Sequence, residues 1–368
     1  MTNAAKYYIW LTIALGYNTP KLKALSELYP DIAAFYEAGE MEWRLSGVLR
    51  SRDIEAMLST PLSAALSVIA DCNRLGYTVI SFGDPDYPRR LYEIYAPPAV
   101  LYVWGRLPDP DRLTLSMVGT RSATRYGKQV AYSIAASIAS LGGVVVSGGA
   151  VGIDTMAHTG AVEAGGKSIC VLGCGLHYRY LMQNFELRRS VASSGAVISE
   201  YPPDFPSGKF TFPNRNRIIS GLSDGVIVVE AGSKSGSLIT ASCALEQDRD
   251  VFAVMGNITS PYSEGTNRLI KDGAVPVTDI SDILQCYPQY RVSNAASSLV
   301  EPVPEHREDL DVSDDAMAVY RVITAEPIHI DTVTSLCGMP VSRVLCALTE
   351  LELCGAVAGE PGRMYKLL

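Results

Sequence analysis

Three stretches rich in glycine and serine each follow a short apolar run. They are VGTRSATRYG after the run that ends at Val118, SGGAVGID after Val146, and EAGSKSGS after Val229. Where a strand passes into a helix through small residues, the first N–H groups of the helix lack partners and carry the positive end of its dipole. One such turn alone only satisfies tight backbone geometry. Three together, with cations beside them, indicate an anion-binding site.

Cationic and aromatic residues accompany these turns. The cations are Arg121, Arg125, Lys128, Arg215, Arg217 and Lys234. A guanidinium can offer a phosphate two parallel hydrogen bonds, and an ammonium offers it a point charge. Phe212, with Phe210 beside it, supplies an apolar face on which a base can stack. Phosphate ligands next to an aromatic platform are typical of sites for single-stranded nucleic acid, although FTFPNRNR read alone also fits a solvated loop.

The segment that carries these residues predicts a parallel α/β sheet. Between residues 113 and 284, apolar runs alternate with helix-like segments; the runs are LTLSMV, GVVVS, SICVLG, AVISE, GVIVVE and VFAVMG. They show little polar alternation, as expected of strands buried on both faces. Alternating strands and helices form a doubly wound, mostly parallel sheet, in which all three turns lie at the carboxyl edge. We therefore expect the turns to form one anion-binding cleft.

The other segments predict further domains around this sheet. The apolar residues of 1–70 recur with helical spacing, which predicts a bundle of short helices. Two short strand-like runs after residue 76 open the α/β domain, which we place at 76–287. The stretch 288–312 loses periodicity and gains proline, serine and charge, which predicts a linker. Residues 313–368 predict three helices and two strands around GEPG, the pattern of a winged helix.

Composition limits the class of protein. The chain has 368 residues, 48% of them hydrophobic and 19% charged, which is typical of a globular protein with two or three domains. Its formal charge of -8 argues against bulk attraction to nucleic acid and leaves only a local cationic patch. The eight cysteines lie mostly in apolar runs, and the apolar run from Tyr7 to Leu15 is too short to span a bilayer. We expect a cytoplasmic protein with no membrane segment.

Other motifs point only weakly to a metal or to catalysis. Cys170, Cys174 and His177 could be drawn as part of a metal site, but a cysteine inside a strand favours packing. Asp154 and His158 share a helix face near Ser147, although an aspartate at a helix start is stabilising by itself. GSKSGS is not a Walker A loop, because its lysine precedes the central glycine. We predict no metal, no cofactor and no catalytic residue.

Several of these motifs together resemble one known family. MVGTRSATRYG, VVSGGAVGIDTMAH, VLGCGL, SEYPP, FPNRNRIISGLSDGVIVVEAGSKSGSLITA and GNITSPYSEGTNRLIKDGA look like DprA, also called Smf, the DNA-processing family of bacteria. The resemblance spans roughly residues 84–284. It implies an extended Rossmann-like domain between an N-terminal SAM-like or helix-hairpin-helix-like domain and a C-terminal winged helix. It also implies a homodimer that binds single-stranded DNA and brings RecA onto DNA during natural transformation, without catalytic turnover.

The resemblance assigns DNA contacts to residues of four motifs. They are Gly119, Thr120, Arg121, Ser147, Gly148, Gly149, Phe212, Arg215, Asn216, Arg217, Lys234, Ser235, Gly236 and Ser237. Asn214 and Val151 stand where relatives often have arginine, which implies weaker binding of DNA here. The segment GTNRLIKDGAVPVTDI is the candidate for part of an association surface.

Two rival functions stay open on the sequence. A Rossmann-like nucleotide-binding enzyme, such as a nucleoside-monophosphate phosphoribohydrolase, needs a catalytic acid, for which Glu230 is the candidate. The usual PGGxGTxxE arrangement of those enzymes is absent. A duplex-binding regulator would use the winged helix, but the segment PVSRVLCALTELEL carries Glu350 and Glu352 besides Arg343, a poor surface for duplex phosphates.

Overall fold

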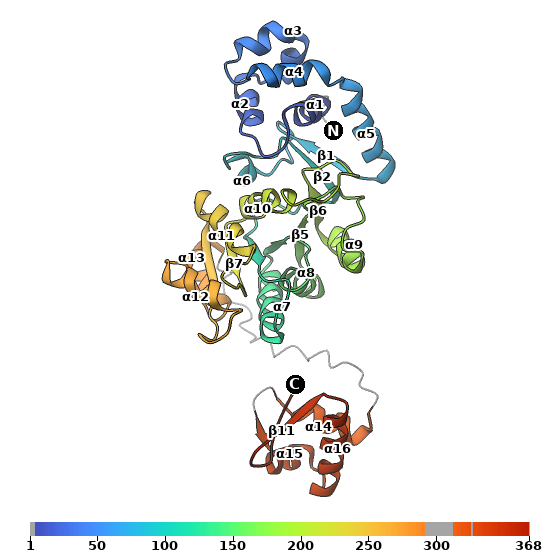
Figure 1. Ribbon diagram of the computed structural model, residues 1–368, viewed down its shortest axis with the longest axis vertical. Helices are drawn as coiled ribbons and strands as arrows, with labels where there is room; N and C mark the ends of the chain where they lie inside the picture. Colours follow the sequence, from blue (N-terminus) through green and yellow to red (C-terminus); the bar gives the residue numbers. More distant parts are fainter. Residues whose placement is uncertain (1–3, 291–311, 325–326, 368) are drawn as a thin grey trace. The chain divides into compact units, whose positions relative to one another are not determined.

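The computed structural model describes residues 4–290, 312–324 and 327–367. The chain forms two compact units, Met1–Ser298 and Leu299–Leu368 (Figure 1). Of the linker predicted at 288–312, only its ends are described: Pro288–Tyr290 form a short 3-10 helix, and residues 291–311 lie outside the described residues.

The larger unit is built on a nine-stranded sheet of order β1-β2-β6-β5-β4-β3-β7-β8-β9. The strands are β1 (Thr78–Ser81), β2 (Val100–Gly105), β3 (Thr114–Val118), β4 (Val144–Ser147), β5 (Lys167–Val171), β6 (Ala196–Ser199), β7 (Gly225–Val228), β8 (Asp250–Val254) and β9 (Val275–Val277). All neighbours from β6 to β9 pair in parallel, whereas β1 and β2 join the edge in antiparallel fashion. The predicted mostly parallel α/β sheet is therefore confirmed.

Helices cover both faces of this sheet (Figure 1). They are α6 (Arg89–Tyr92), α7 (Arg125–Ser140), α8 (Ile153–Glu163), α9 (Phe185–Ser194), α10 (Thr211–Gly221), α11 (Ser237–Glu246), α12 (Glu264–Lys271) and α13 (Ile280–Cys286). In β4, Val144 and Val146 join the core under α10 and α11, and Val145 joins the core under α7 and α8. Alternate residues of a strand point to opposite faces, so a double-sided core requires the nearly continuous apolar runs seen in the sequence.

The N-terminal segment forms the predicted short helices. They are α1 (Ala5–Leu15), α2 (Lys21–Leu28), α3 (Ile32–Leu45), α4 (Ser51–Ser59) and α5 (Leu62–Leu75). The apolar α1 is a buried helix, as predicted, with Ile9 and Trp10 almost fully enclosed. Its Tyr8 ring lies 5.5 Å from that of Phe82, next to β1. Helices and sheet therefore share one continuous core within a single compact unit.

The smaller unit has the predicted winged-helix pattern. Its elements are α14 (Asp314–Val322), β10 (Ile328–His329), α15 (Ile330–Cys337), α16 (Val341–Leu353), β11 (Val357–Glu360) and β12 (Met364–Leu367). The three strands pair in the order β10-β12-β11, and the two-residue β10 was not predicted. Val319, Val333, Val344 and Leu348 close a separate core between the helices.

No single helix in the described part of the chain has both the length and the apolar character needed to cross a membrane. Two sharply bent helix pairs meet that test together on length and composition alone: Ser51–Ser59 with Leu62–Leu75, and Ile330–Cys337 with Val341–Leu353.

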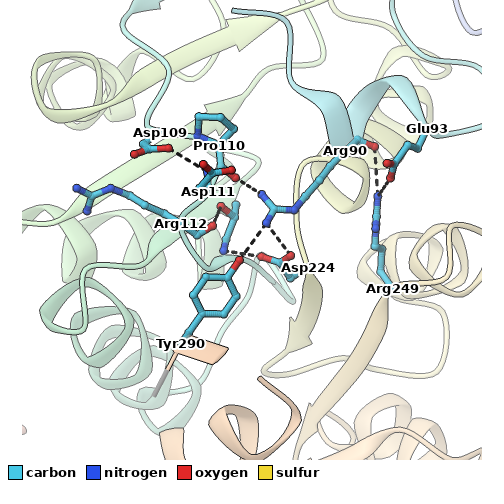
Figure 2. Close-up of polar contacts among 10 residues, drawn as sticks. Arg90, Glu93, Asp109, Pro110, Asp111, Arg112, Asp224, Arg249 and Tyr290 are labelled. Atoms are coloured by element: carbon cyan, nitrogen blue, oxygen red, sulfur yellow. Dashed lines mark hydrogen bonds and ion pairs between the residues drawn. The ribbon is translucent and has the colours of Figure 1, made fainter. Parts of the chain in front are cut away.

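A polar network fixes the amino edge of the parallel sheet (Figure 2). The guanidinium of Arg90, in α6, pairs with the Asp224 carboxylate at 2.9 Å and donates to the carbonyl oxygen of Pro110 at 2.6 Å. The other Asp224 oxygen accepts from the backbone N–H of Thr114, the first residue of β3, at 2.9 Å. Because Asp224 directly precedes β7, one carboxylate aligns the starts of the neighbouring strands β3 and β7.

We expect Asp224→Asn to lower the free energy of unfolding of the larger unit by about 1–3 kcal/mol, since it leaves Arg90 half-buried without its counter-charge. All three tryptophans, Trp10, Trp43 and Trp104, lie in this unit, so tryptophan fluorescence during urea unfolding reports on it alone. Asp71→Asn is the matched control, because its ion pair with Arg74 is largely exposed. Equal effects of the two changes would contradict the role assigned to Asp224.

Candidate functional site

The three glycine-rich turns lie side by side at the carboxyl edge of the sheet. Strand β3 pairs in parallel with β4 on one side and with β7 on the other, so the turns that follow them are neighbours. Beside them lies a cleft of about 290 Å³. Its lining includes nine of the residues assigned to DNA contact: Gly119, Thr120, Arg121, Phe212, Arg215, Asn216, Ser235, Gly236 and Ser237. The predicted convergence of the turns is confirmed.

Glu230 holds the first turn in shape. Its two carboxylate oxygens accept from the hydroxyl and the backbone N–H of Thr124, at 2.5 and 2.9 Å. Its backbone oxygen accepts from the N–H of Thr120 at 2.8 Å. A Cβ at Gly127, in the first turn of α7, would lie 2.2 Å from this carboxylate, so a larger residue there would displace the Glu230 side chain. Glu230 thus anchors the start of α7. The enzyme alternative depended on Glu230 as its candidate catalytic acid, and this structural role accounts for the residue without catalysis.

The second turn differs from the expectation that it exposes free N–H groups. Ser147, Gly148 and Gly149 are buried. The N–H groups of Gly148 and Ala150 donate to one oxygen of Asp154, at 3.1 and 3.3 Å. The Asp154 carboxylate therefore occupies the N–H groups that were expected to bind an external anion.

Arg215 lies on the floor of the cleft, only 6% exposed. Its Nη1 donates to the carbonyl oxygens of Gly148 and Val171, at 2.5 and 2.6 Å. Its Nε has no partner among the described residues. A Cβ at Gly148 would lie 2.0 Å from Nη1, so only glycine permits this approach. The structure thus brings Arg215 to the site as a buried structural cation, whereas the sequence suggested an exposed phosphate ligand.

Burial controls the ionisation of the groups below the cleft. It raises the pKa of Asp154, an effect that the nearby Arg215 partly offsets. Burial also lowers the pKa of Arg215, and Asp154 counteracts part of that shift. The pKa of His158 falls to about 3, first through burial and then through the charge of Arg215. His158 is therefore neutral at physiological pH.

These groups do not form a catalytic triad. Nδ1 of His158 lies 2.8 Å from the hydroxyl of Ser168 and is thus engaged away from Asp154. The hydroxyl of Ser147 donates to the carbonyl oxygen of Met117 at 2.7 Å. The hydrolase interpretation of Ser147, Asp154 and His158 is not supported, because within the described residues no hydrogen bond joins His158 to either Ser147 or Asp154.

Arg217 points away from the cleft. It forms a buried ion pair with Glu200 at 2.7 Å, and its Nε donates to the side-chain oxygen of Asn18 at 2.8 Å. The amide of Asn18 donates in turn to Asn214 at 3.1 Å. The loop between α1 and α2 therefore reaches α10, and Arg217 connects the N-terminal helices to the site. Neither Asn18, 199 residues from Arg217, nor Glu200, 17 residues from it, was identified from the sequence, since no local motif marks either contact.

The segment FTFPNRNR forms the first part of helix α10, which the sequence analysis did not expect. Pro213 sits in the first turn, where its missing N–H breaks no intrahelical bond. The helix places the ring of Phe212 at the cleft, with the Arg121 guanidinium 5.5 Å from its centroid. Phe210, 82% exposed, precedes the helix, and Lys234 is exposed on the third turn.

The residues considered for a metal serve other purposes. Cys170 and Cys174 are buried and unpaired, as the packing interpretation predicted. His177 instead pairs through Nδ1 with Asp204 at 2.7 Å. Within residues 4–290, 312–324 and 327–367, no group of three or more His, Cys, Asp or Glu could hold a metal ion.

The winged helix presents little free positive charge on its third helix. Nε of Arg343 in α16 donates to Asp315 at 2.6 Å, and a second guanidinium bond reaches the same carboxylate. Glu350 accepts from the backbone and the hydroxyl of Ser313. The side chains of Val341 and Leu345 are exposed on this helix. Such a face is poorly suited to duplex phosphates.

Comparison with known proteins gives matches along most of the chain. The family model for DNA recombination-mediator protein A matches residues 78–288, and that for the DprA winged helix domain matches residues 303–363. The chain is 36% identical over 323 residues to Protein Smf of Escherichia coli K12, covering 87% of this chain and 85% of that protein. It is 42% identical over 226 residues to DNA processing protein DprA of Bacillus subtilis, covering 61% and 76%.

Solved structures show the same fold. The X-ray structure of DNA processing protein A from Streptococcus pneumoniae matches with a TM-score of 0.66 and 34% identity, covering 76% of this chain and 97% of that one. DNA processing protein A from Helicobacter pylori, whose structure was described for its single-stranded DNA binding mode, matches with a TM-score of 0.52 and 31% identity. That match covers 58% of this chain and 96% of the other.

The low pKa of His158 predicts a specific loss of stability in acid. Between its folded pKa of about 3 and its ordinary value of 6.5, the unfolded chain binds a proton that the folded chain excludes. The free energy of unfolding therefore falls as pH drops below 6.5, by at most about 1.4 kcal/mol per pH unit from this group. Asp154, with its raised pKa, acts in the opposite direction.

The His158→Gln variant lacks the imidazole and therefore its contribution to the pH dependence of the free energy of unfolding. Asp154 contributes to that dependence in both the parent and the variant. We expect the stability difference between parent and variant to shrink steadily from pH 7 to pH 4.5, measured by urea unfolding with tryptophan fluorescence. Parallel pH curves for the two proteins would contradict a buried neutral His158.

Proposed function

Because the chain belongs to the DprA/Smf family of DNA-processing proteins, we propose that it binds single-stranded DNA in the cleft at the carboxyl edge of its sheet. We further propose that it acts as a recombination mediator, which brings RecA onto DNA that enters the cell during natural transformation. The description of the matching family model and the single-stranded DNA binding of the Helicobacter pylori relative support this proposal.

One observation carries the proposal: an exposed cation and an aromatic ring meet at the cleft. The Arg121 guanidinium lies 5.5 Å from the centroid of the Phe212 ring. Small residues of the first and third turns, Gly119 and Gly236 among them, line the space next to this pair. A base can stack on the ring while the neighbouring phosphate meets Arg121, Lys234 and backbone N–H groups. A duplex, whose bases are already stacked, gains nothing from the ring.

The acidic total charge does not conflict with this function. Residues 299–368 contain twelve Asp and Glu residues against five Lys and Arg, which accounts for almost all of the net charge of -8. The larger unit is therefore nearly neutral, and salt screens the interaction of its exposed cations with charges more than about 10 Å away. We expect binding by few phosphate contacts, with a modest dependence on salt.

Further parts of the proposal concern assembly and location. A homodimer would raise the affinity for one DNA strand through avidity. Residues 265–280, which include most of helix α12 and all of strand β9, are our candidate for part of the association surface. We place the protein in the cytoplasm, where RecA acts, and assign it neither a cofactor nor a catalytic step.

The test titrates the full chain with a labelled 20-nucleotide oligothymidylate, the corresponding duplex and nucleoside monophosphates. We expect a preference for the single strand. Arg121→Ala and Lys234→Ala should each weaken binding by roughly tenfold and reduce the slope of log K against log salt by about 0.7. Arg74→Ala, which removes an exposed cation from α5, is the matched control and should leave binding unchanged.

Arg215 and Arg217 are unsuitable for this test, because alanine at either position leaves buried groups such as Glu200 without partners. The proposal fails if the single strand is not preferred, or if Arg121→Ala and Lys234→Ala bind it as the parent does. Release of a base from a nucleoside monophosphate would favour the enzyme alternative instead.

A further inference from the structure

A fourth turn lies at the same edge of the sheet, and the sequence analysis assigned it no role in binding. It comprises residues 172–181, between β5 and the short 3-10 helix Met182–Asn184. Strand β5 pairs in parallel with β4, so this turn follows the second glycine-rich turn along the carboxyl edge. It carries His177, Tyr178, Arg179 and Tyr180 in sequence.

The turn is held firmly by its neighbours. The N–H of Gly175 donates to the carbonyl oxygen of Phe205 at 2.9 Å, and that of His177 donates to Pro203 at 2.8 Å. A Cβ at Gly175 would lie 2.1 Å from two carbonyl oxygens, so this close approach requires glycine. At the other end, the Asn184 amide donates to the carbonyl oxygen of Gly149 at 3.2 Å. The turn is therefore attached both to the segment after β6 and to the second glycine-rich turn.

The side chains of this turn continue the platform formed by Arg121 and Phe212. The ring of Tyr180 lies 5.2 Å from that of Phe212, with 43° between the planes. Gly173 makes room for this pair, since a Cβ there would lie 2.9 Å from the Phe212 ring. The guanidinium of Arg121 and the two rings therefore form one cluster of flat groups that joins the cleft to the turn after β5.

The residue directly before Tyr180 is an available cation. Arg179 is exposed and takes part in no ion pair within the described part of the chain, and the ring of Tyr178 beside it is 37% exposed. His177, by contrast, is paired with Asp204. An anchored turn that presents an aromatic ring and an unpaired guanidinium next to a stacking platform has the features of a nucleotide subsite.

We propose that residues 172–181 form a second stacking subsite, in which Tyr180 receives the base adjacent to the one on Phe212 and Arg179 contacts its phosphate. This inference rests on the proposed binding of single-stranded DNA. It extends the path of the strand from the cleft across β4 to β5. A strand on this path meets two successive aromatic faces, each flanked by an arginine.

The experiment compares Tyr180→Ala with Tyr180→Phe, which keeps the ring. With the labelled 20-nucleotide oligothymidylate we expect Tyr180→Ala to bind about tenfold more weakly and Tyr180→Phe to bind within twofold of the parent. Arg179→Gln should lose about threefold to tenfold at low salt and less at high salt. Tyr95→Ala, at an 82% exposed tyrosine outside residues 172–181, is the control and should bind as the parent does.

A second measurement separates stacking from mere support of Phe212. Short oligothymidylates with one abasic nucleotide, moved position by position, are titrated with the parent and with Tyr180→Ala. Stacking predicts one abasic position at which the difference between the two proteins disappears, adjacent to the position at which Phe212→Ala behaves likewise. An equal loss at every position means that Tyr180 only supports Phe212, which overturns the proposal.

Photochemical crosslinking of the unaltered full chain gives a result that no folding defect can imitate. An oligonucleotide carrying 5-iodo-deoxyuridine should crosslink to Tyr180 or Tyr178, identified by mass spectrometry of the peptides. Crosslinks confined to the region of Phe212 would overturn the subsite while leaving the proposed function intact. A parent protein that does not bind the single strand refutes the proposed function itself, so the two failures are distinguishable.

Discussion

At the carboxyl edge of the sheet, the guanidinium of Arg215 lies buried against the carbonyl oxygens of Gly148 and Val171, with Asp154 nearby. A buried charge is costly unless surrounding groups replace the water that it loses, and here backbone dipoles and a carboxylate do so. The second glycine-rich turn, the end of β5 and helix α10 must all keep their positions for this to hold. The floor of the cleft is therefore rigid before any ligand arrives.

This constraint separates two classes of cation that look alike in the sequence. Arg215 and Arg217 are held inside by partners at the end of β5, directly after β6 and in the loop between α1 and α2, so they define where α10 lies. Arg121, Arg179 and Lys234 are exposed around the edge of the sheet. The inner pair fixes the position of α10, and the exposed group supplies the positive charge at the surface of the cleft edge. Because α10 bears both Arg215 and Phe212, the same buried contact also fixes the aromatic face of the site.

The contact of Asn18 with Arg217 and Asn214 ties the N-terminal helices to the same helix. One continuous core links α1 to β1, β2 and the face of the sheet under α10. The helical segment is therefore part of the framework of the site as well as a neighbour in sequence. Asn214 stands where relatives often have arginine. Its side chain accepts a hydrogen bond from Asn18, whereas an arginine at this position would carry a positive charge.

The sequence by itself determined the fold class, because buried strands need nearly continuous apolar runs and tight strand-to-helix turns need glycine. It also determined the order of the helical, α/β and winged-helix segments and the meeting of the three turns, since parallel strands place their carboxyl ends at one edge. Only the tertiary structure decided which arginines are buried, that Glu230 and Asp154 hold turns, and that Tyr180 stands beside Phe212. Those outcomes depend on contacts between residues far apart in the chain, and the desolvation of a charged group cannot be read from its local sequence.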